Sequence, residues 1–366
     1  MKKFLAIALI AVVAVAAVFA NGSSESASSE VKIGFIGPLT GDYANYGTLC
    51  RQAVEMAIDE CNAKGGIDGM TVKLIAEDSE GDPNKAYAAM EKLANTDKVS
   101  AVIGPVLTGE AFSVGPIACE LGVLSVTPSD GLQGEVAGKY WYQILGYRKL
   151  AVLYAKNDYS QGLYEGMKES FEADGGSIVA VETFMVGDKD FKTQLTKLKD
   201  TDAEAIYIPD YTAEMAQILE QASQLGVNKP FLSGDGFLSE EIYQLAGEYT
   251  DGVVYTASAQ LEETSLVKEF RDAYTAKWGI GPDSFATNSY DATNILLSVI
   301  DEVGTDRKAI RDGFAAVKDF EGVNGTINFA ENGDLVAYQG IYEVEGNTPK
   351  YVGAFKIENG KVVKVN

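Results

Sequence analysis

The sequence contains no histidine among its 366 residues. This absence excludes a Ser-His-Asp or Cys-His catalytic centre and any metal site built on imidazole. No glycine-rich phosphate loop or metal-ligand spacing replaces it, and GFIGPLTG, residues 34–41, lacks the spacing of a dinucleotide fingerprint. An acid pair such as Asp158 with Asp130 is the remaining candidate for a catalytic site. The sequence has no nucleophile–base motif to accompany it. We therefore expect a protein that is not an enzyme and needs no cofactor and no metal.

Cysteine is scarce, with only Cys50, Cys61 and Cys119 in the chain. Cys50 and Cys61 are predicted to share one helix, where their eleven-residue separation spans roughly 16 Å. That distance is too long for a disulfide. Pairing of either one with Cys119 stays open, and we expect three buried thiols that pack as small apolar residues.

Basic residues are few: 30 lysines and arginines face 53 acidic residues, for a formal charge of −23. Removal of Lys2 and Lys3 with the leader described below changes this to −25. A strongly negative surface repels nucleic acids and anionic lipids. We therefore expect no nucleic-acid partner.

Long hydrophobic runs are absent apart from one at the N-terminus. Residues 1–3 are basic, residues 4–18 are apolar, and Val18 and Ala20 are small residues ahead of a cleavage site. This pattern predicts a secretory signal peptide over residues 1–20 rather than a membrane anchor, because the run is short for a span. Residues 21–30, NGSSESASSE, predict a disordered leader. With no cysteine near the cleavage site, we expect no lipid anchor and free diffusion in the periplasm.

From residue 31 onward, β-rich runs alternate with amphipathic helical patterns. Such alternation predicts an α/β fold with parallel sheets covered by helices, in which ligands bind at the carboxyl ends of the strands. The predicted strands cover residues 31–37, 72–78, 99–103, 123–127, 151–155, 177–184, 203–208 and 231–234. The predicted helices include one ending at residues 64–66, one starting at Pro83 behind an Asp82 cap, and residues 110–121, 160–174, 191–199 and 213–225.

Two features predict two lobes. The β/α units are more numerous than one open sheet comfortably holds. The tail, residues 341–365, changes to alternating hairpins with turns at Gly346-Asn347 and Asn359-Gly360.

Six collinear segments resemble those of a known family. They are KIGFIGPLTGDYANYG, AIDECNAKGGIDG, VIGPVLTGEA, LAVLYAKNDYSQGLYEG, SYDATNILLSVIDEVG and GVNGTINFAENGDL. In this order they resemble the periplasmic leucine/isoleucine/valine-binding proteins, the type I solute-binding proteins of ABC importers. The resemblance covers nearly all of residues 31–366. It implies two Rossmann-like lobes joined by three crossovers, with residues 31–144 plus 259–334 in one lobe and 145–258 plus 335–366 in the other.

One passage departs from that expectation. Residues 141–144 and 151–155 both have the pattern of strands, and only about six residues separate them, whereas a parallel crossover needs a dozen or more. The resemblance implies a helix at this place, so we expect an internal deletion near residues 145–150. A deletion that damages the second lobe, an error in the sequence, and a working variant in which the two strands run into one another are the three alternatives.

The stretch VIGPVLTGEA, residues 102–111, predicts a ligand-binding turn. A strand that feeds a helix through a small polar turn leaves backbone N–H groups free to hold an anion. The resemblance implies that the Thr108 hydroxyl and the backbone of Val106, Leu107 and Thr108 hold the ligand carboxylate. The alternative is that Thr108 only caps the helix that contains Glu110.

The stretch TPSDGLQ, residues 127–133, is the second predicted wall, with Ser129, Asp130 and Gly131 at the ligand. The family pattern has a small residue and then a threonine where this chain has Asp130 and Gly131. Asp130 could pair with a ligand ammonium, repel a ligand carboxylate, or be a solvated turn acid. This departure puts leucine-type specificity in question.

Four further residues complete the predicted site. The resemblance places Tyr211 in the cleft, Asp235 on the ligand ammonium, Tyr159 over the ligand and Tyr46 against its side chain. Each has a structural alternative: an Asp-Gly turn for Asp235, a helix-entry staple for Tyr159, and core or surface positions for the other tyrosines.

The predicted function is that of a secreted solute-binding protein. We expect it to capture an amino acid, of branched-chain type or a related small amide, in a cleft between two lobes. As a monomer it would deliver this ligand to the membrane permease of an ABC transporter. The alternative is a ligand-sensing domain of the same fold without a transport role.

Overall fold

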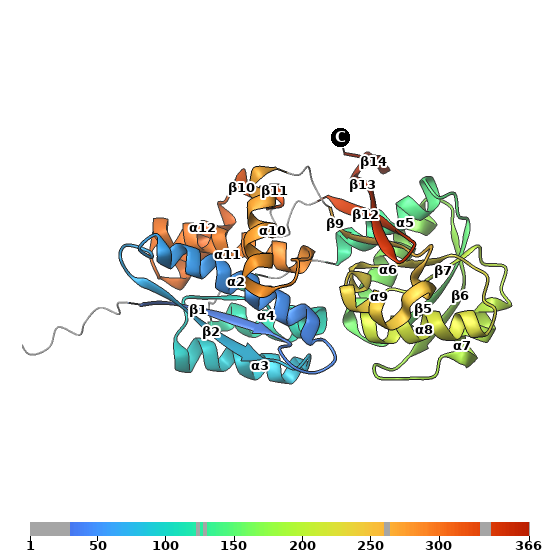
Figure 1. The fold of residues 1–366 in the computed structure, drawn as a ribbon, viewed down its shortest axis with the longest axis horizontal. Coiled ribbons are helices and arrows are strands. Elements are labelled where there is room, and N and C mark those ends of the chain that lie inside the picture. The colour runs from blue at the N-terminus through green and yellow to red at the C-terminus, as the bar shows by residue number, and fades with distance from the viewer. Residues whose placement is uncertain (1–29, 122–124, 127–129, 260–263, 330–337, 366) are drawn as a thin grey trace, which may run out of the picture.

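The computed structural model describes residues 30–121, 125–126, 130–259, 264–329 and 338–365. The predicted signal peptide, and the predicted leader up to residue 29, lie outside these ranges, while Glu30 is the first residue of a strand. Within the described ranges, no helix has both the length and the apolar character that a membrane span requires. Two α/β lobes lie side by side (Figure 1).

The first lobe is built on a four-stranded parallel sheet in the order β2-β1-β3-β4. Alternate residues of β1 face opposite sides: Ile33 and Phe35 pack on α2 and α11, whereas Ile36 packs on α3 and α4. The strands are β1 (Glu30–Gly37), β2 (Thr71–Asp78), β3 (Ala101–Ile103) and β4 (Ser125–Val126). The other elements are α2 (Ala44–Ala63), α3 (Pro83–Glu91), the π-helix η1 (Lys92–Asp97), α4 (Thr108–Leu121), α10 (Ser265–Trp278), α11 (Ser284–Val303), α12 (Arg307–Ala315), β10 (Phe320–Gly322) and β11 (Gly325–Ile327). Asp82 caps α3 as predicted, because its side chain accepts the N–H groups of Asn84 and Lys85.

The second lobe is built on an eight-stranded mixed sheet in the order β14-β13-β12-β9-β8-β7-β5-β6. Its parallel part comprises β5 (Lys149–Ala155), β6 (Ser177–Phe184), β7 (Ala205–Tyr207), β8 (Phe231–Ser233) and β9 (Val254–Ser258). Antiparallel strands extend it: β12 (Gln339–Glu345), β13 (Thr348–Glu358) and β14 (Lys361–Lys364). Its helices are α5 (Gly131–Gln143), α6 (Asp158–Ala173), α7 (Lys192–Lys199), α8 (Thr212–Gln224) and α9 (Glu240–Ala246), with 3-10 turns η2 (Asp235–Phe237) and η3 (Gly247–Thr250). The predicted hairpin turns are confirmed by positive φ at residues 346–347 and 359–360.

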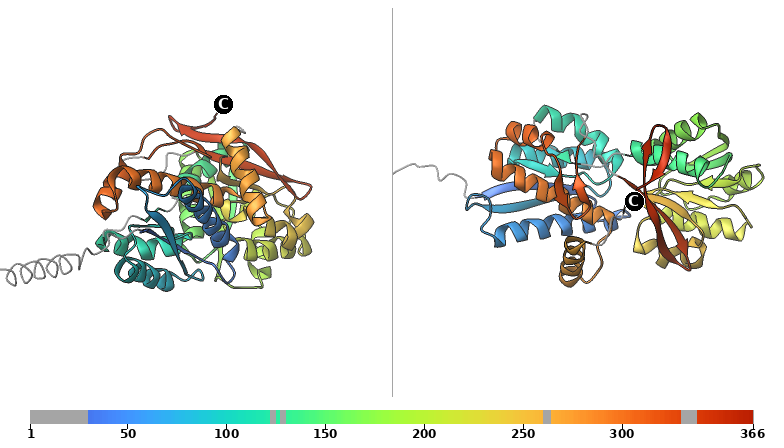
Figure 2. Two further views of the ribbon diagram at one scale, coloured as in Figure 1. Left: turned by 60° about the vertical axis from the view of Figure 1, so that its left-hand side comes forward. Right: turned by 90° about the horizontal axis from the view of Figure 1, so that it is seen from above.

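The chain crosses between the lobes three times. It enters the second lobe between β4 and α5, returns between β9 and α10, and crosses again between β11 and β12 (Figure 2). The predicted fold class, two α/β lobes joined by three crossovers, is therefore confirmed.

The prediction of a strand at residues 141–144 is wrong. The prediction that the crossover helix is missing is also wrong. Residues 141–143 are the last turn of α5, which links β4 to β5. Val136, Ala137, Tyr140 and Trp141 are buried along one face of this helix, with the spacing of an amphipathic helix. Residues 144–148 are then only the turn from α5 to β5, where Gly146 has a φ of 81°.

The predicted lobe boundary at residue 145 is corrected for the same reason. α5 packs on the second lobe: Tyr140 contacts Phe355 edge-on, Tyr142 contacts Phe171, and Gln143 Oε1 accepts the N–H of Val362 at 3.0 Å. The second lobe therefore begins at α5.

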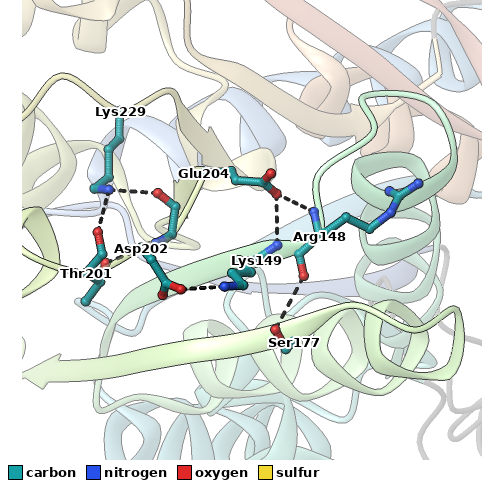
Figure 3. A network of polar contacts seen from close by, with 8 residues as sticks. Arg148, Lys149, Ser177, Thr201, Asp202, Glu204 and Lys229 are labelled. Atoms are coloured by element: carbon teal, nitrogen blue, oxygen red, sulfur yellow. Dashed lines mark hydrogen bonds and ion pairs between the residues drawn. The ribbon is translucent and has the colours of Figure 1, made fainter.

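A polar network fixes the entry to β5 (Figure 3). The Glu204 carboxylate accepts the N–H groups of Arg148 and Lys149, and these two bonds lower the pKa of Glu204. Lys149 Nζ pairs with Asp202, and Ser177 Oγ donates to the Arg148 carbonyl at 3.4 Å. The turn after α5 is thereby bonded to both neighbours of β5 in the sheet.

The three cysteines are free thiols. Cys50 and Cys61 share α2, as predicted. Cys50 is buried, Cys61 is partly exposed and Cys119 is exposed, so the prediction of three buried thiols is wrong for Cys61 and Cys119. Cys119 lies opposite the buried face of α4.

Candidate functional site

The start of α4 forms one wall of the space between the lobes. Thr108 is the first residue of this helix, and its Oγ1 donates a hydrogen bond to Asp130 Oδ2 at 2.6 Å. The Leu107 N–H donates to Glu110 Oε2 at 3.3 Å. Glu110 is only 1% exposed, and burial raises its pKa to about 7. Two donors of the predicted carboxylate cradle are therefore engaged by the protein's own acids.

Asp130 lies directly before α5 and does not cap it, because its side chain makes no capping hydrogen bond. Its partly buried carboxylate instead contacts Thr108 of the first lobe. Burial, and then the charge of Asp235, raise the pKa of Asp130 to about 7. This environment contradicts the alternative of a solvated turn acid. Gly131 is the first residue of α5, and Ser129 lies outside the described residues.

The second lobe contributes the opposite wall. Tyr159, at the start of α6, donates its hydroxyl to Asp235 Oδ1 at 2.7 Å and accepts the N–H of Gly236 at 2.7 Å. Burial raises the pKa of Asp235. The Tyr159 ring stacks on Tyr211 with a centroid separation of 4.5 Å. Asp235 thus has a defined partner beyond the chemistry of an Asp-Gly turn.

An aromatic and aliphatic cluster joins these walls, and we call it the interlobe cluster. Tyr46 of α2 contacts Tyr211 and Phe285 edge-on, at centroid distances of 5.5 and 5.3 Å. Its members are Tyr46, Leu107, Tyr159, Leu163 and Tyr211, with Tyr43, Val106 and Phe285 packed against them. The predicted site residues Tyr46, Val106, Leu107, Tyr159 and Tyr211 therefore come together.

Direct hydrogen bonds close the lobes onto one another. Tyr46 Oη donates to the Gly236 carbonyl at 2.7 Å, accepts the Thr212 N–H at 3.2 Å and lies 2.9 Å from Thr212 Oγ1. Asn45 Nδ2 donates to Ser239 Oγ at 3.2 Å. Within the second lobe, the backbone at Gly236 lies close to the backbone of Asp210. A Cβ on Gly236 would lie 2.6 Å from the Asp210 carbonyl oxygen, so only glycine fits at this position. The structure is a closed conformation.

Sequence reasoning missed four residues of this region: Glu110, Asp210, Thr212 and Gly236. Thr212 and Gly236 directly follow the predicted residues Tyr211 and Asp235, which is the one signal that could have found them. Glu110 accepts the N–H of Leu107, three residues earlier, which is a local contact at the start of α4. The partner of Asp210 is Ser160, and that contact depends on how α6 is placed, which the sequence does not specify.

The site follows the carboxyl ends of several parallel strands. Thr108 comes after β3, Tyr159 after β5, Tyr211 after β7 and Asp235 after β8. Ligands of open α/β sheets bind at such ends. Two lobes of this kind, with the strand ends facing one another across a hinge, define a two-lobed ligand-binding protein.

The chain belongs to the periplasmic binding protein family, whose model matches residues 30–144 and 125–349. A leucine-, isoleucine-, valine-, threonine- and alanine-binding protein of Pseudomonas aeruginosa is 30% identical over 86% of this chain and 89% of its own. The substrate-binding protein LivJ of Streptococcus pneumoniae, solved with isoleucine, is 31% identical. It covers 92% of this chain and 100% of its own, with a TM-score of 0.82. The leucine-binding protein LivK of Thermotoga maritima is 29% identical, covers 88% of this chain and 98% of its own, and has a TM-score of 0.83.

Proposed function

We propose that this protein is a periplasmic solute-binding protein that captures a small amine, an amino acid or a related amide, between its lobes. It delivers the ligand as a monomer to the permease of an ABC importer. The observation that carries the proposal is the interlobe cluster, in which aromatic rings from both lobes meet at the strand ends, beside the carboxylates of Asp130 and Asp235. Relatives named for branched-chain amino acids support it.

The mechanism is closure of the lobes around the ligand, and no covalent bond changes. A ligand that touches both lobes stabilises the closed conformation by its greater affinity for that state. The Tyr46 hydroxyl contributes to the same equilibrium, because its bonds to Gly236 and Thr212 exist only when the lobes meet. The closed surface is what a permease would recognise.

A thermal melt tests the proposed function. The purified mature chain is heated alone and with leucine, isoleucine, valine or their carboxamides. A ligand at 100 times its Kd stabilises the folded protein by about 2.7 kcal/mol, which raises the melting temperature. Tyr211→Ala removes a cluster ring and should abolish the shift, whereas Tyr249→Ala, at a 37% exposed position, should retain it. A wild-type melt that no compound shifts contradicts the proposal.

Tyr46→Phe tests the closure mechanism. The change removes only the hydroxyl, so the closed form loses its bonds to Gly236 and Thr212, and ligand affinity should fall by about 1–2 kcal/mol. Calorimetric titration measures the affinity, and small-angle scattering of the liganded protein measures closure. Tyr87→Phe, at a 41% exposed position on α3, is the matched control. Equal affinity in both variants would show that this hydroxyl does not stabilise the closed form.

A further inference from the structure

Three carboxylates lie at the place where a ligand would bind. Asp130 is hydrogen-bonded to Thr108 and Asp235 to Tyr159, and Leu107, next to Thr108, packs with Tyr159 in the interlobe cluster. In agreement with this placement, the charge of Asp235 contributes to the raised pKa of Asp130. Asp210 precedes Tyr211 and is 1% exposed. Its Oδ1 accepts Ser160 Oγ at 3.4 Å, and its Oδ2 has no hydrogen-bond partner among the residues described. Buried carboxylates of this kind require a cation or further donors.

No lysine or arginine in the part of the chain that the structure describes reaches these three carboxylates. Within the described ranges, no hydrogen bond or ion pair joins a lysine or arginine to Asp130, Asp210 or Asp235. Residues 122–124, 127–129, 260–263 and 330–337, which lie outside the description, contain no lysine or arginine. The ionised form of these acids therefore needs a charge from outside the described residues, and a cationic ligand would supply it.

Two of the donors predicted for a ligand carboxylate are already engaged. Thr108 gives its hydroxyl to Asp130, and Leu107 gives its N–H to Glu110. A carboxylate placed at the start of α4 would displace Asp130 from Thr108 and face the ionised acid at short range. Like charges set against one another in a closed interface cost several kcal/mol.

From these contacts we propose that the ligand is a small organic cation without a free carboxylate, such as an amino-acid amide. Its ammonium group lies between Asp130 and Asp235, and its apolar part packs on Tyr46, Tyr159 and Tyr211. This inference rests on the proposed function and specifies its substrate class. Thr108 then positions Asp130 instead of contacting a ligand carboxylate.

The pH dependence of binding follows from the same arrangement. The titratable groups that face Asp130 among the described residues are Asp235 of η2, Tyr207 of β7 and Tyr211 before α8. With its pKa raised to about 7, Asp130 takes up a proton between pH 7.5 and pH 6. A cationic ligand prefers the ionised acid, so its affinity falls over this range. A zwitterion is repelled by the ionised acid, so its affinity rises.

Matched ligands and a matched variant test the inference. Titration calorimetry compares leucine, isoleucine and valine with leucinamide, isoleucinamide and valinamide at pH 7.5 and pH 6, in wild type and in Asp130→Asn. Wild type should bind at least one amide about tenfold or more tighter than its amino acid at pH 7.5. Asp130→Asn keeps an oxygen for Thr108 but removes the charge, so it should reduce that preference about tenfold or more and remove the part of its pH dependence that Asp130 causes. Asp130→Thr, which also removes the charge and keeps an oxygen for the Thr108 hydroxyl, should do the same and replaces Asp130→Asn if that variant fails to fold.

The outcomes separate the two proposals. Tighter binding of the amino acids by wild type, or an amide preference that both folded variants retain, overturns the inference and leaves the proposed function standing. Binding of neither series overturns the proposed function and the inference together.

Discussion

Asp235→Asn is expected to weaken ligand binding by about 2 kcal/mol, roughly thirtyfold, without unfolding the protein. Asparagine retains an oxygen for the Tyr159 hydroxyl, which now bonds to Asp235 Oδ1 at 2.7 Å. The substitution therefore removes the charge and little of the packing. Calorimetric titration with the ligand that raises the melting temperature most would measure the loss.

The control for this variant is Asp200→Asn, which removes an acid of the same lobe at an exposed helix end. It should leave affinity unchanged. If Asp235→Asn also bound within threefold of wild type, Asp235 would be only a turn residue and the ammonium site would lie elsewhere.

Trp141→Ala should cause the largest loss of stability, about 3–5 kcal/mol. Trp141 is fully buried in α5 and packs in the same core cluster as Leu150, Val152 and Phe171 of the second lobe. Truncation leaves a cavity between the helix and the sheet. Urea unfolding followed by circular dichroism would measure the lowered free energy of unfolding.

Phe112→Ala is the matched control, because Phe112 is 67% exposed on α4. Its stability should stay within about 0.5 kcal/mol of wild type. Similar free energies of unfolding for the two variants would mean that α5 does not pack against the second sheet. The damaged second lobe expected from the sequence would then be the better description.

The β/α alternation was enough to predict most of the fold, because buried parallel strands and amphipathic helices have different periods. It failed at α5. Trp141, Tyr142 and Ile144 form a short apolar run, and such a run fits a strand as well as the end of a buried helix. The helical face is visible only when Val136 and Ala137, one turn earlier, are read together with Tyr140 and Trp141.

The site could be predicted in part, because the resemblance to the family pointed to Thr108, Tyr159, Tyr211 and Asp235. Their positions in the fold agree with it, since residues that follow parallel strands gather at one edge of a sheet. The bond between Thr108 and Asp130 could not be predicted. It joins Thr108 of the first lobe to Asp130, the residue directly before α5, and depends on the angle at which the lobes close.

The three crossovers make both lobes discontinuous in sequence, and this affects how the chain folds as it is synthesised. The first lobe lacks α10 to α12 until the second has been started, and the second lacks β12 to β14 until nearly the whole chain has emerged. β12 separates β9 from β13 in the sheet, and Val362 of β14 bonds to α5. A nascent chain therefore cannot complete either core early. This delay keeps most of the polypeptide without a finished core until late in synthesis.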